Sequence, residues 1–253
     1  MVILITGAIT PAGNIAKTAL TDSEKRKEQY ILSIEKTIDQ LSQYKLDTVN
    51  ANKIIRDVSL VYCDNSDPSL EIFDEVKDYA KKKNIAIELL LFKGDNEAVS
   101  KKGKGYGEGE ITKYAFENSE FIKKASFIFK LTGRLTIDNL SEIIKKIDIS
   151  KMYFNVPNKT RRDICDTRFY ALSKDNYEKF FINAYENVDD NNNHFLEHVF
   201  IERIRNNKLK VYNFPKYPLY SGMSGTAGTN YSYVGWKSKI KDIMSLFGYY
   251  RVK

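Results

Sequence analysis

Acidic and basic side chains at three places in the sequence have the types and spacing needed for acid–base and phosphate chemistry. Asp166 and Arg168 stand two apart in a stretch with a strand pattern, so their side chains point the same way. Glu197, in a predicted helix, is a candidate general base. Lys130 and Arg134 bracket a glycine at a predicted strand end, which suits a diphosphate or sugar hydroxyls. Each set has a purely structural alternative. Asp166 and Arg168 could form a cross-strand ion pair, Glu197 could be an ordinary helix residue, and Lys130 with Arg134 could belong to a surface turn.

A glycine-rich segment, residues 102–109, offers a second kind of binding chemistry. Its alternating glycines let backbone N–H groups approach a phosphate closely, and its lysines add positive charge. Lys104, Gly105 and Tyr106 are the candidate ligand-binding residues here, and a flexible surface loop is the alternative. The segment is not a Walker A motif, because no Lys-Ser/Thr pair follows the last glycine.

Metal-binding patterns are sparse in this sequence. Asp166 is a candidate ligand for Mn²⁺ or Mg²⁺, but Arg168 stands where a second acid would be needed, and one carboxylate is a poor Mg²⁺ site. His194 and His198 lie four residues apart, yet no third ligand motif accompanies them. A metal-independent reaction, in which basic side chains neutralise a diphosphate, therefore stays open beside metal binding.

Composition and charge narrow the class of protein. The 253 residues are 42% hydrophobic, which is ample for one large α/β domain. The two cysteines lie far apart without metal spacing, which indicates free thiols in a reducing compartment. No stretch approaches the roughly 20 apolar residues that span a bilayer. The net charge of +7 is spread among 33 acids and no nucleic-acid motif is present, so we expect a cytoplasmic protein that does not bind nucleic acid.

Strand and helix patterns alternate along the first half of the chain. Continuous apolar runs predict strands, amphipathic stretches predict helices between them, and this order is typical of a parallel sheet with crossover helices. We expect an α/β, Rossmann-like domain over residues 1–235, with a mostly parallel central sheet flanked by helices, and a helical tail over 236–253. That tail packs on the domain or lies on an anionic membrane surface. Strands are expected at residues 2–5, 58–62, 85–92, 127–131, 152–156, 166–172 and 209–212, and loops at 103–109 and 215–233.

The residues with binding chemistry cluster where the predicted strands end. Thr6 and Gly7 end the first strand, and Asp64 and Asn65 follow the second. Ligands of open α/β sheets bind at the carboxyl ends of the strands. The sequence therefore predicts a small-molecule site at this edge of the sheet.

Six short segments, taken in order, resemble bacterial glycosyltransferases of the GT-A type (the nucleotide-diphospho-sugar transferase fold) from capsule and lipopolysaccharide O-antigen synthesis. The resemblance covers roughly residues 1–235, and its strength lies in the order of the segments. The matching segments are residues 22–30, 62–66, 103–109, 130–134 and 166–170, and Phe214 and Pro215 with the Ser- and Gly-rich stretch 221–228.

The resemblance implies a single GT-A-like domain that transfers a sugar from a nucleotide-diphosphate sugar, with a UDP-sugar as the first expectation. The acceptor would be a hydroxyl of a glycan or lipid-linked molecule, at the inner face of the membrane. By that analogy Asp64 and Asn65 face the base and ribose, and Lys104 and Gly105 lie along the donor. Asp166 takes the place of a metal-binding acid, although the sequence has no Asp-x-Asp motif there.

Two other functions stay open at this point. A sugar-nucleotide nucleotidyltransferase would use a similar sheet, but the loop after the first strand, residues 6–14, carries no Lys or Arg. A non-catalytic basic module is the other alternative, and the tail 236–253 is the feature that favours it.

Overall fold

The computed structural model describes residues 1–11, 22–51, 57–155, 163–223 and 230–232, together with Ile240 and Ile243. The tail expected over 236–253 therefore lies outside the described residues, apart from those last two. The same holds for most of the Ser- and Gly-rich stretch 221–228.

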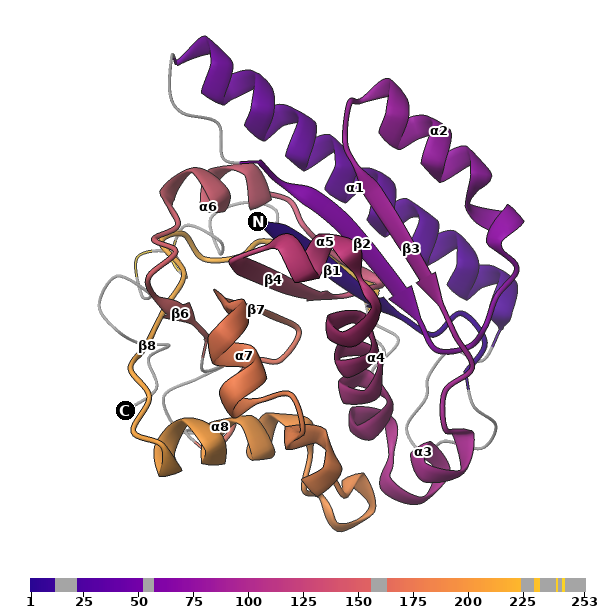
Figure 1. Ribbon diagram of the computed structural model, residues 1–253, viewed down its shortest axis with the longest axis vertical. Helices are drawn as coiled ribbons and strands as arrows, with labels where there is room; N and C mark the ends of the chain where they lie inside the picture. Colours follow the sequence, from indigo (N-terminus) through magenta and orange to yellow (C-terminus); the bar gives the residue numbers. More distant parts are fainter. Residues whose placement is uncertain are drawn as a thin grey trace.

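A seven-stranded sheet forms the centre of the protein, in the order β3-β2-β1-β4-β7-β6-β8 (Figure 1). Every pairing in it is parallel except those that β7 makes with β4 and β6. The expected α/β class with a mostly parallel sheet is thus confirmed. The strands are β1 (Val2–Gly7), β2 (Ser59–Asp64), β3 (Ile87–Leu91), β4 (Phe127–Thr132), β6 (Met152–Tyr153), β7 (Phe169–Ser173) and β8 (Val211–Tyr212).

Helices cover both faces of this sheet. Successive residues of a strand point to opposite faces, so a continuous apolar strand places side chains on both faces that must be buried. Ile3 and Ile5 of β1 belong to one apolar core, whereas Val2 and Leu4 belong to the other. The first core lies under α1 (Ser23–Asn50), α2 (Asp74–Lys82) and α6 (Leu140–Lys146). The second lies under α4 (Lys104–Asn118), α5 (Glu120–Lys124), α7 (Lys174–Phe180) and α8 (Leu196–Asn206).

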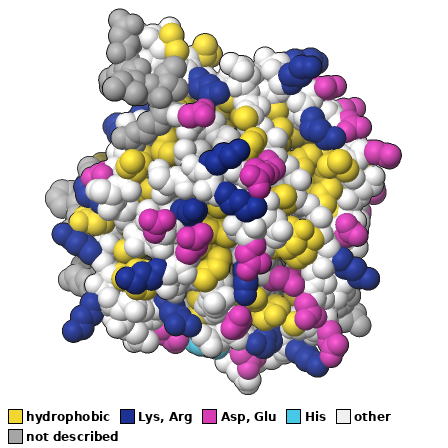
Figure 2. All heavy atoms as spheres, viewed as in Figure 1, with side chains coloured by type: hydrophobic (Ala, Val, Ile, Leu, Met, Phe, Trp, Pro, Cys, Tyr) yellow, Lys and Arg dark blue, Asp and Glu magenta, His cyan; other side chains and the backbone are white. Residues whose placement is uncertain are grey.

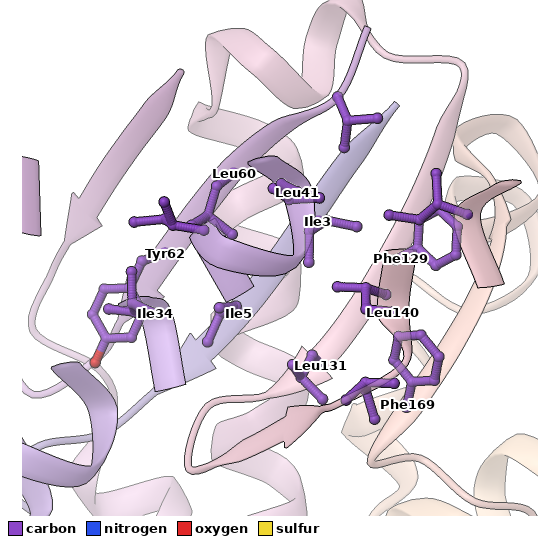
Figure 3. Close-up of a cluster of buried hydrophobic side chains, with 14 of the residues drawn as sticks. Ile3, Ile5, Ile34, Leu41, Leu60, Tyr62, Phe129, Leu131, Leu140 and Phe169 are labelled. Carbon is purple, nitrogen blue, oxygen red and sulfur yellow. The ribbon is translucent and has the colours of Figure 1, made fainter. Parts of the chain in front are cut away.

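The first core shows how α1 is held on the sheet. Asp22 caps the helix by accepting hydrogen bonds from the backbone of Glu24 and Lys25. Ile34 and Leu41 then point from one face of the helix into a fully buried cluster with Leu60 and side chains of β1 and β4 (Figure 3).

A small antiparallel sheet, in the order β10-β9-β5, extends the carboxyl end of β4. It consists of β5 (Leu135–Ile137), β9 (Tyr220–Met223) and β10 (Asn230–Ser232). The sequence patterns did not predict it, and the expectation of an unbroken loop over 215–233 was wrong. Short helical segments complete the chain: α3 (Asn96–Lys102), η1 (Leu70–Phe73), η2 (Ala184–Asn187) and η3 (Asp190–Asn192).

The glycine-rich segment 103–109 is the main correction to the expected elements. It is no loop, because α4 begins at Lys104 and runs through it to Asn118. A Cβ on Gly109 would overlap the side chain of Tyr185, and one on Gly105 would crowd Val188. These glycines let α4 pack closely on the segment around η2, which is a structural reason for their presence.

Charged side chains are interspersed on the face drawn in Figure 2, with Lys and Arg beside Asp and Glu and apolar atoms between them. This mixture agrees with the interleaved charges of the sequence. Within the described residues, no helix combines the length and apolar character that crossing a bilayer takes.

Candidate functional site

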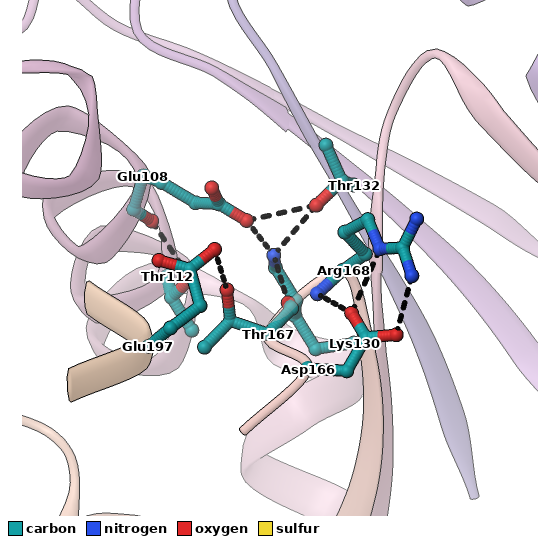
Figure 4. Close-up of polar contacts among 8 residues, drawn as sticks. All are labelled: Glu108, Thr112, Lys130, Thr132, Asp166, Thr167, Arg168 and Glu197. Atoms are coloured by element: carbon teal, nitrogen blue, oxygen red, sulfur yellow. Dashed lines mark hydrogen bonds and ion pairs between the residues drawn. The ribbon is translucent and has the colours of Figure 1, made fainter. Parts of the chain in front are cut away.

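The carboxyl ends of β1, β2 and β4 and the start of β7 meet at one edge of the sheet. Thr6 pairs with Thr132 of β4, and the N–H of Gly133 donates to the Thr6 carbonyl at 2.9 Å. Because β7 is antiparallel to β4, its first residues come back to this edge, and the N–H of Thr132 donates to the Arg168 carbonyl at 2.9 Å. The predicted site residues around Lys130 and Asp166 are thereby brought together, as Figure 4 shows.

Lys130 is a buried cation at the centre of this cluster. Its side chain is 1% exposed, and Nζ contacts Glu108 Oε1, the Thr132 hydroxyl at 3.0 Å and the Thr167 carbonyl at 3.0 Å. Burial lowers the pKa of Lys130, and the nearby carboxylates of Glu197 and Asp166 oppose this effect. With three N–H donors and three partners, Lys130 holds protein groups in place. A direct contact with a diphosphate, as the sequence predicts, would require Lys130 to release one of these partners.

Glu108 is a site residue that the sequence did not reveal. It lies on α4, and its Oε1 accepts from both Lys130 and the Thr132 hydroxyl, the latter at 2.9 Å. No hydrogen bond to Oε2 occurs within the described residues, and the side chain is 26% exposed. Glu108 stands four residues before Thr112, a spacing that places two polar side chains on one face of a helix. The surrounding glycines indicated a loop instead, so this signal was missed.

Glu197 lies in the first turn of α8, where the helix N-terminus favours a negative charge. The Thr167 hydroxyl donates to its Oε1 at 3.1 Å, and within the described residues no other hydrogen bond reaches the carboxylate. The backbone N–H of Cys165 donates to the Glu197 carbonyl, which ties α8 to the segment before β7. Glu197 therefore receives a hydrogen bond from a neutral hydroxyl, with the Lys130 ammonium within electrostatic range, and its Oε2 has no hydrogen bond among the described residues.

Asp166 and Arg168 form a bidentate ion pair. Arg168 Nε donates to Oδ1 at 2.8 Å and Nη2 donates to Oδ2 at 2.7 Å, while the Tyr220 hydroxyl donates to Oδ2 at 3.0 Å. Burial acts to raise the pKa of Asp166, but the Arg168 guanidinium and these hydrogen bonds outweigh it and hold the pKa below its usual range. The Arg168 guanidinium also stacks over the Tyr220 ring, 4.5 Å from its centroid.

This pairing fits a divalent cation poorly. Both oxygens of Asp166 already accept hydrogen bonds, so metal binding would require it to release Arg168 and Tyr220. In the part of the chain that the structure describes, no three His, Cys, Asp or Glu side chains are grouped to hold a metal ion. His194 and His198 instead bond to Glu202 and to the backbone N–H of Phe195, respectively.

Arg134 lies on the other face of the sheet, beside α1. It is partly buried, and its Nη1 has no hydrogen-bond partner among the described residues. Burial lowers the pKa of Arg134, the Tyr30 hydroxyl raises it, and the neighbouring Arg26 lowers it again. Both guanidinium groups thus lie near the Tyr30 hydroxyl, which makes this corner of the edge attractive to an anion.

Arg26 and Asp64 shape the loop that follows β1. Arg26 Nε donates to the carbonyls of Ala8 and Ile9, each at 3.0 Å. Asp64 is fully buried, and its Oδ2 accepts from the Tyr62 hydroxyl at 2.6 Å and the Ile9 N–H at 3.1 Å. The carboxylate of Asp64 therefore holds the loop in place, and its contact with a nucleoside stays a prediction.

Asn65, which follows β2, lies between the end of that strand and α4. Its side-chain amide donates to Glu110 Oε2 at 3.1 Å, and Glu110 Oε1 accepts from the Asp95 N–H at 2.8 Å. Thr6 is buried in the sheet, and a Cβ on Gly7 would overlap the Tyr62 hydroxyl. These contacts hold the ends of β1 and β2 against α4.

The predicted residues of the glycine-rich segment are less central than expected. The N–H of Gly105 donates to Asp190 Oδ2 at 3.1 Å, so this amide is already paired within the protein. Tyr106 packs on the Tyr185 ring with centroids 4.9 Å apart. Lys104 lies one helical turn before Glu108 and so shares its side of α4.

A separate hollow of about 300 Å³ lies between α1 and β5 and contains none of the predicted site residues. The polar cluster at the sheet edge is the better candidate, since it gathers Lys130, Asp166, Arg168 and Glu197 as expected. The hollow is lined by Lys36, Thr37, Asp39, Gln40, Thr136, Ile137 and Asp138.

Comparison with known proteins adds no family to this description. No protein-family model matches the chain, and no curated protein matches it either.

Proposed function

We propose that this protein is a glycosyltransferase that moves a sugar from a nucleotide-diphosphate sugar to a hydroxyl of a glycan or lipid-linked acceptor. The observation that carries the proposal is that a candidate anion-binding group and a candidate proton acceptor lie at the same edge of the sheet. Among the described residues, the buried Nη1 of Arg134 has no hydrogen-bond partner and could donate to an anion, and one oxygen of Glu197 could accept a proton. Both are tied to the end of β4, Arg134 through the chain and Glu197 through Thr167 and Lys130.

The basic corner supports a diphosphate as the bound anion. Arg134 and Arg26 lie within electrostatic range of each other, and Arg26 donates to the backbone of the loop that follows β1. A phosphate oxygen placed on Arg134 would satisfy the buried Nη1 and reduce the repulsion between the two guanidinium groups. The carboxyl ends of β1 and β2 are also where open α/β sheets bind nucleotides.

The acidic side supports the transfer step. An acceptor hydroxyl attacks the anomeric carbon, the bond from that carbon to the diphosphate oxygen breaks, and Glu197 takes the hydroxyl proton. The nucleoside diphosphate leaves with the bonding electrons, and Arg134 stabilises its charge. Arg168 would add to this stabilisation from its pair with Asp166.

The mostly parallel sheet, doubly wound in its first half and with one antiparallel strand in its second, is compatible with the GT-A type that the sequence resembles. On that analogy the donor is a UDP-sugar, the product belongs to a bacterial surface polysaccharide such as capsule or lipopolysaccharide, and the enzyme works in the cytoplasm at the inner face of the membrane.

Ligand-induced stabilisation tests this proposal. We expect UDP or GDP, or one of their sugar conjugates, to raise the melting temperature by about 5–10 °C at a hundred times its Kd. Arg134→Met should abolish most of that shift, whereas Arg205→Gln, an exposed arginine of α8, should retain it. The panel is run with and without Mn²⁺. No shift with any nucleotide, or an equal shift in Arg134→Met, would contradict the proposal.

A further inference from the structure

The two carboxylates of the cluster are held in different ways. Glu108 Oε1 is fixed by the Lys130 ammonium and the Thr132 hydroxyl, whereas among the described residues Glu197 Oε1 receives the Thr167 hydroxyl alone. Lys130 links the two, because the same ammonium donates to the carbonyl of Thr167. Both second oxygens are free of hydrogen bonds within the described residues.

This difference separates their roles. Oε1 of Glu108 already accepts from the Lys130 ammonium and the Thr132 hydroxyl, so Oε2 is the oxygen that a ligand can meet. An ionised carboxylate can only accept hydrogen bonds, and its bond to a hydroxyl is stronger than a bond between two neutral groups. Glu108 is therefore suited to bind a hydroxyl without reacting with it.

The surroundings make Glu108 a rigid binding group. Lys130 is buried, and α4 is pressed against its neighbours at Gly105 and Gly109, so the helix has little freedom to shift. The side chain of Glu108 is 26% exposed and can be reached from solvent. A preorganised acceptor of this kind discriminates between ligands, because a wrongly matched group costs desolvation without a compensating bond.

On the basis of the proposed function, we propose that Glu108 is a specificity residue that accepts a hydrogen bond from a hydroxyl of the transferred sugar. Together Glu108 and Glu197 present acceptor oxygens to the sugar ring. Such a pair binds a neutral, hydroxyl-bearing sugar and repels a sugar that carries a carboxylate. The donor class is accordingly a neutral sugar nucleotide and not a uronic acid nucleotide.

UDP-glucose and UDP-glucuronate are matched probes, since they differ only in having a hydroxymethyl or a carboxylate group at one carbon. We expect the wild-type protein to bind UDP-glucose at least about tenfold more tightly, as measured by isothermal titration calorimetry. Glu108→Gln should reduce the ratio of the two dissociation constants to less than about threefold, because the repulsion between the Glu108 carboxylate and the glucuronate carboxylate is lost. Glu117→Gln, an exposed acid on the same helix, should keep the ratio of the wild type.

The outcomes separate this inference from the proposed function. If UDP and UDP-glucose bind but the wild type takes UDP-glucuronate equally well, the inference is overturned and the glycosyltransferase proposal stands. An unchanged ratio in folded Glu108→Gln overturns it too. If no nucleotide binds at all, both proposals fail. Circular dichroism checks folding, and the wild-type ratio decides the question if the variant unfolds. GDP-mannose and GDP-mannuronate replace the pair if GDP alone stabilises the protein.

Discussion

Replacing Lys130 by methionine tests the buried ion pair on which the site geometry depends. Methionine fills much of the space of the lysine stem but removes the ammonium, so Glu108 loses its countercharge and the Thr167 carbonyl loses a donor. Breaking a buried pair costs about 3–5 kcal/mol. Because the Glu108 side chain is 26% exposed, water recovers part of this, and we expect about 2–3 kcal/mol of lost stability.

Urea unfolding followed by circular dichroism measures this loss, and a double-mutant cycle assigns it. Lys130→Met combined with Glu108→Gln should be more stable than the sum of the single effects by at least about 1 kcal/mol, since the second change removes the unpaired charge. Lys101→Met is the control, because its pair with Glu97 is exposed and should contribute less than about 0.5 kcal/mol. A Lys130→Met protein as stable as this control, or additive effects in the cycle, would refute the reasoning.

Three further predictions concern the packing and charge of the same region. Gly109→Ala should destabilise the protein by about 1–3 kcal/mol in thermal unfolding, because the new Cβ overlaps Tyr185; a neutral effect would mean that α4 packs less closely. The pKa of Asp166 is held below its usual range mainly by Arg168 against the effect of burial, so its charge stabilises the fold above about pH 4. Asp166→Asn should therefore cost most stability at neutral pH, and the cost should shrink as the pH falls through the lowered pKa; a constant cost from pH 7 to pH 2 would argue against the ion pair. Asp64→Asn should weaken nucleotide binding and cost about 1–3 kcal/mol, because the carboxylate accepts hydrogen bonds that hold the β1 loop; wild-type Kd and stability would contradict this.

The sequence predicted the parts of the fold that depend on local patterns. The apolar runs that became β1, β2 and β4 are continuous because these strands are buried on both faces, and that pattern can be recognised without a structure. The edge where they end was predicted for the same reason. The antiparallel direction of β7 was not predicted, because strand direction depends on long-range pairing.

Glu108 and Arg134 show why the site could be predicted only in part. The glycines around Glu108 have a packing function against Tyr185 and Val188, which cannot be recognised before the partner segment is known. Lys130 and Arg134 were predicted to bracket a glycine at a strand end, but the sequence did not show that Arg134 would lie on the α1 side, next to Tyr30. Residue types indicated candidate side chains, and tertiary contacts decided which of them are accessible.

The most direct test of the central claim is sugar transfer itself. The purified protein is incubated with the nucleotide sugar that stabilises it most and with a panel of glycan and lipid-linked acceptors, and the products are followed by mass spectrometry. We predict a glycosylated acceptor and free nucleoside diphosphate, with turnover reduced by at least about a hundredfold in Glu197→Gln and unchanged in Glu202→Gln on the same helix. Release of pyrophosphate instead, or full turnover in Glu197→Gln, would contradict the account.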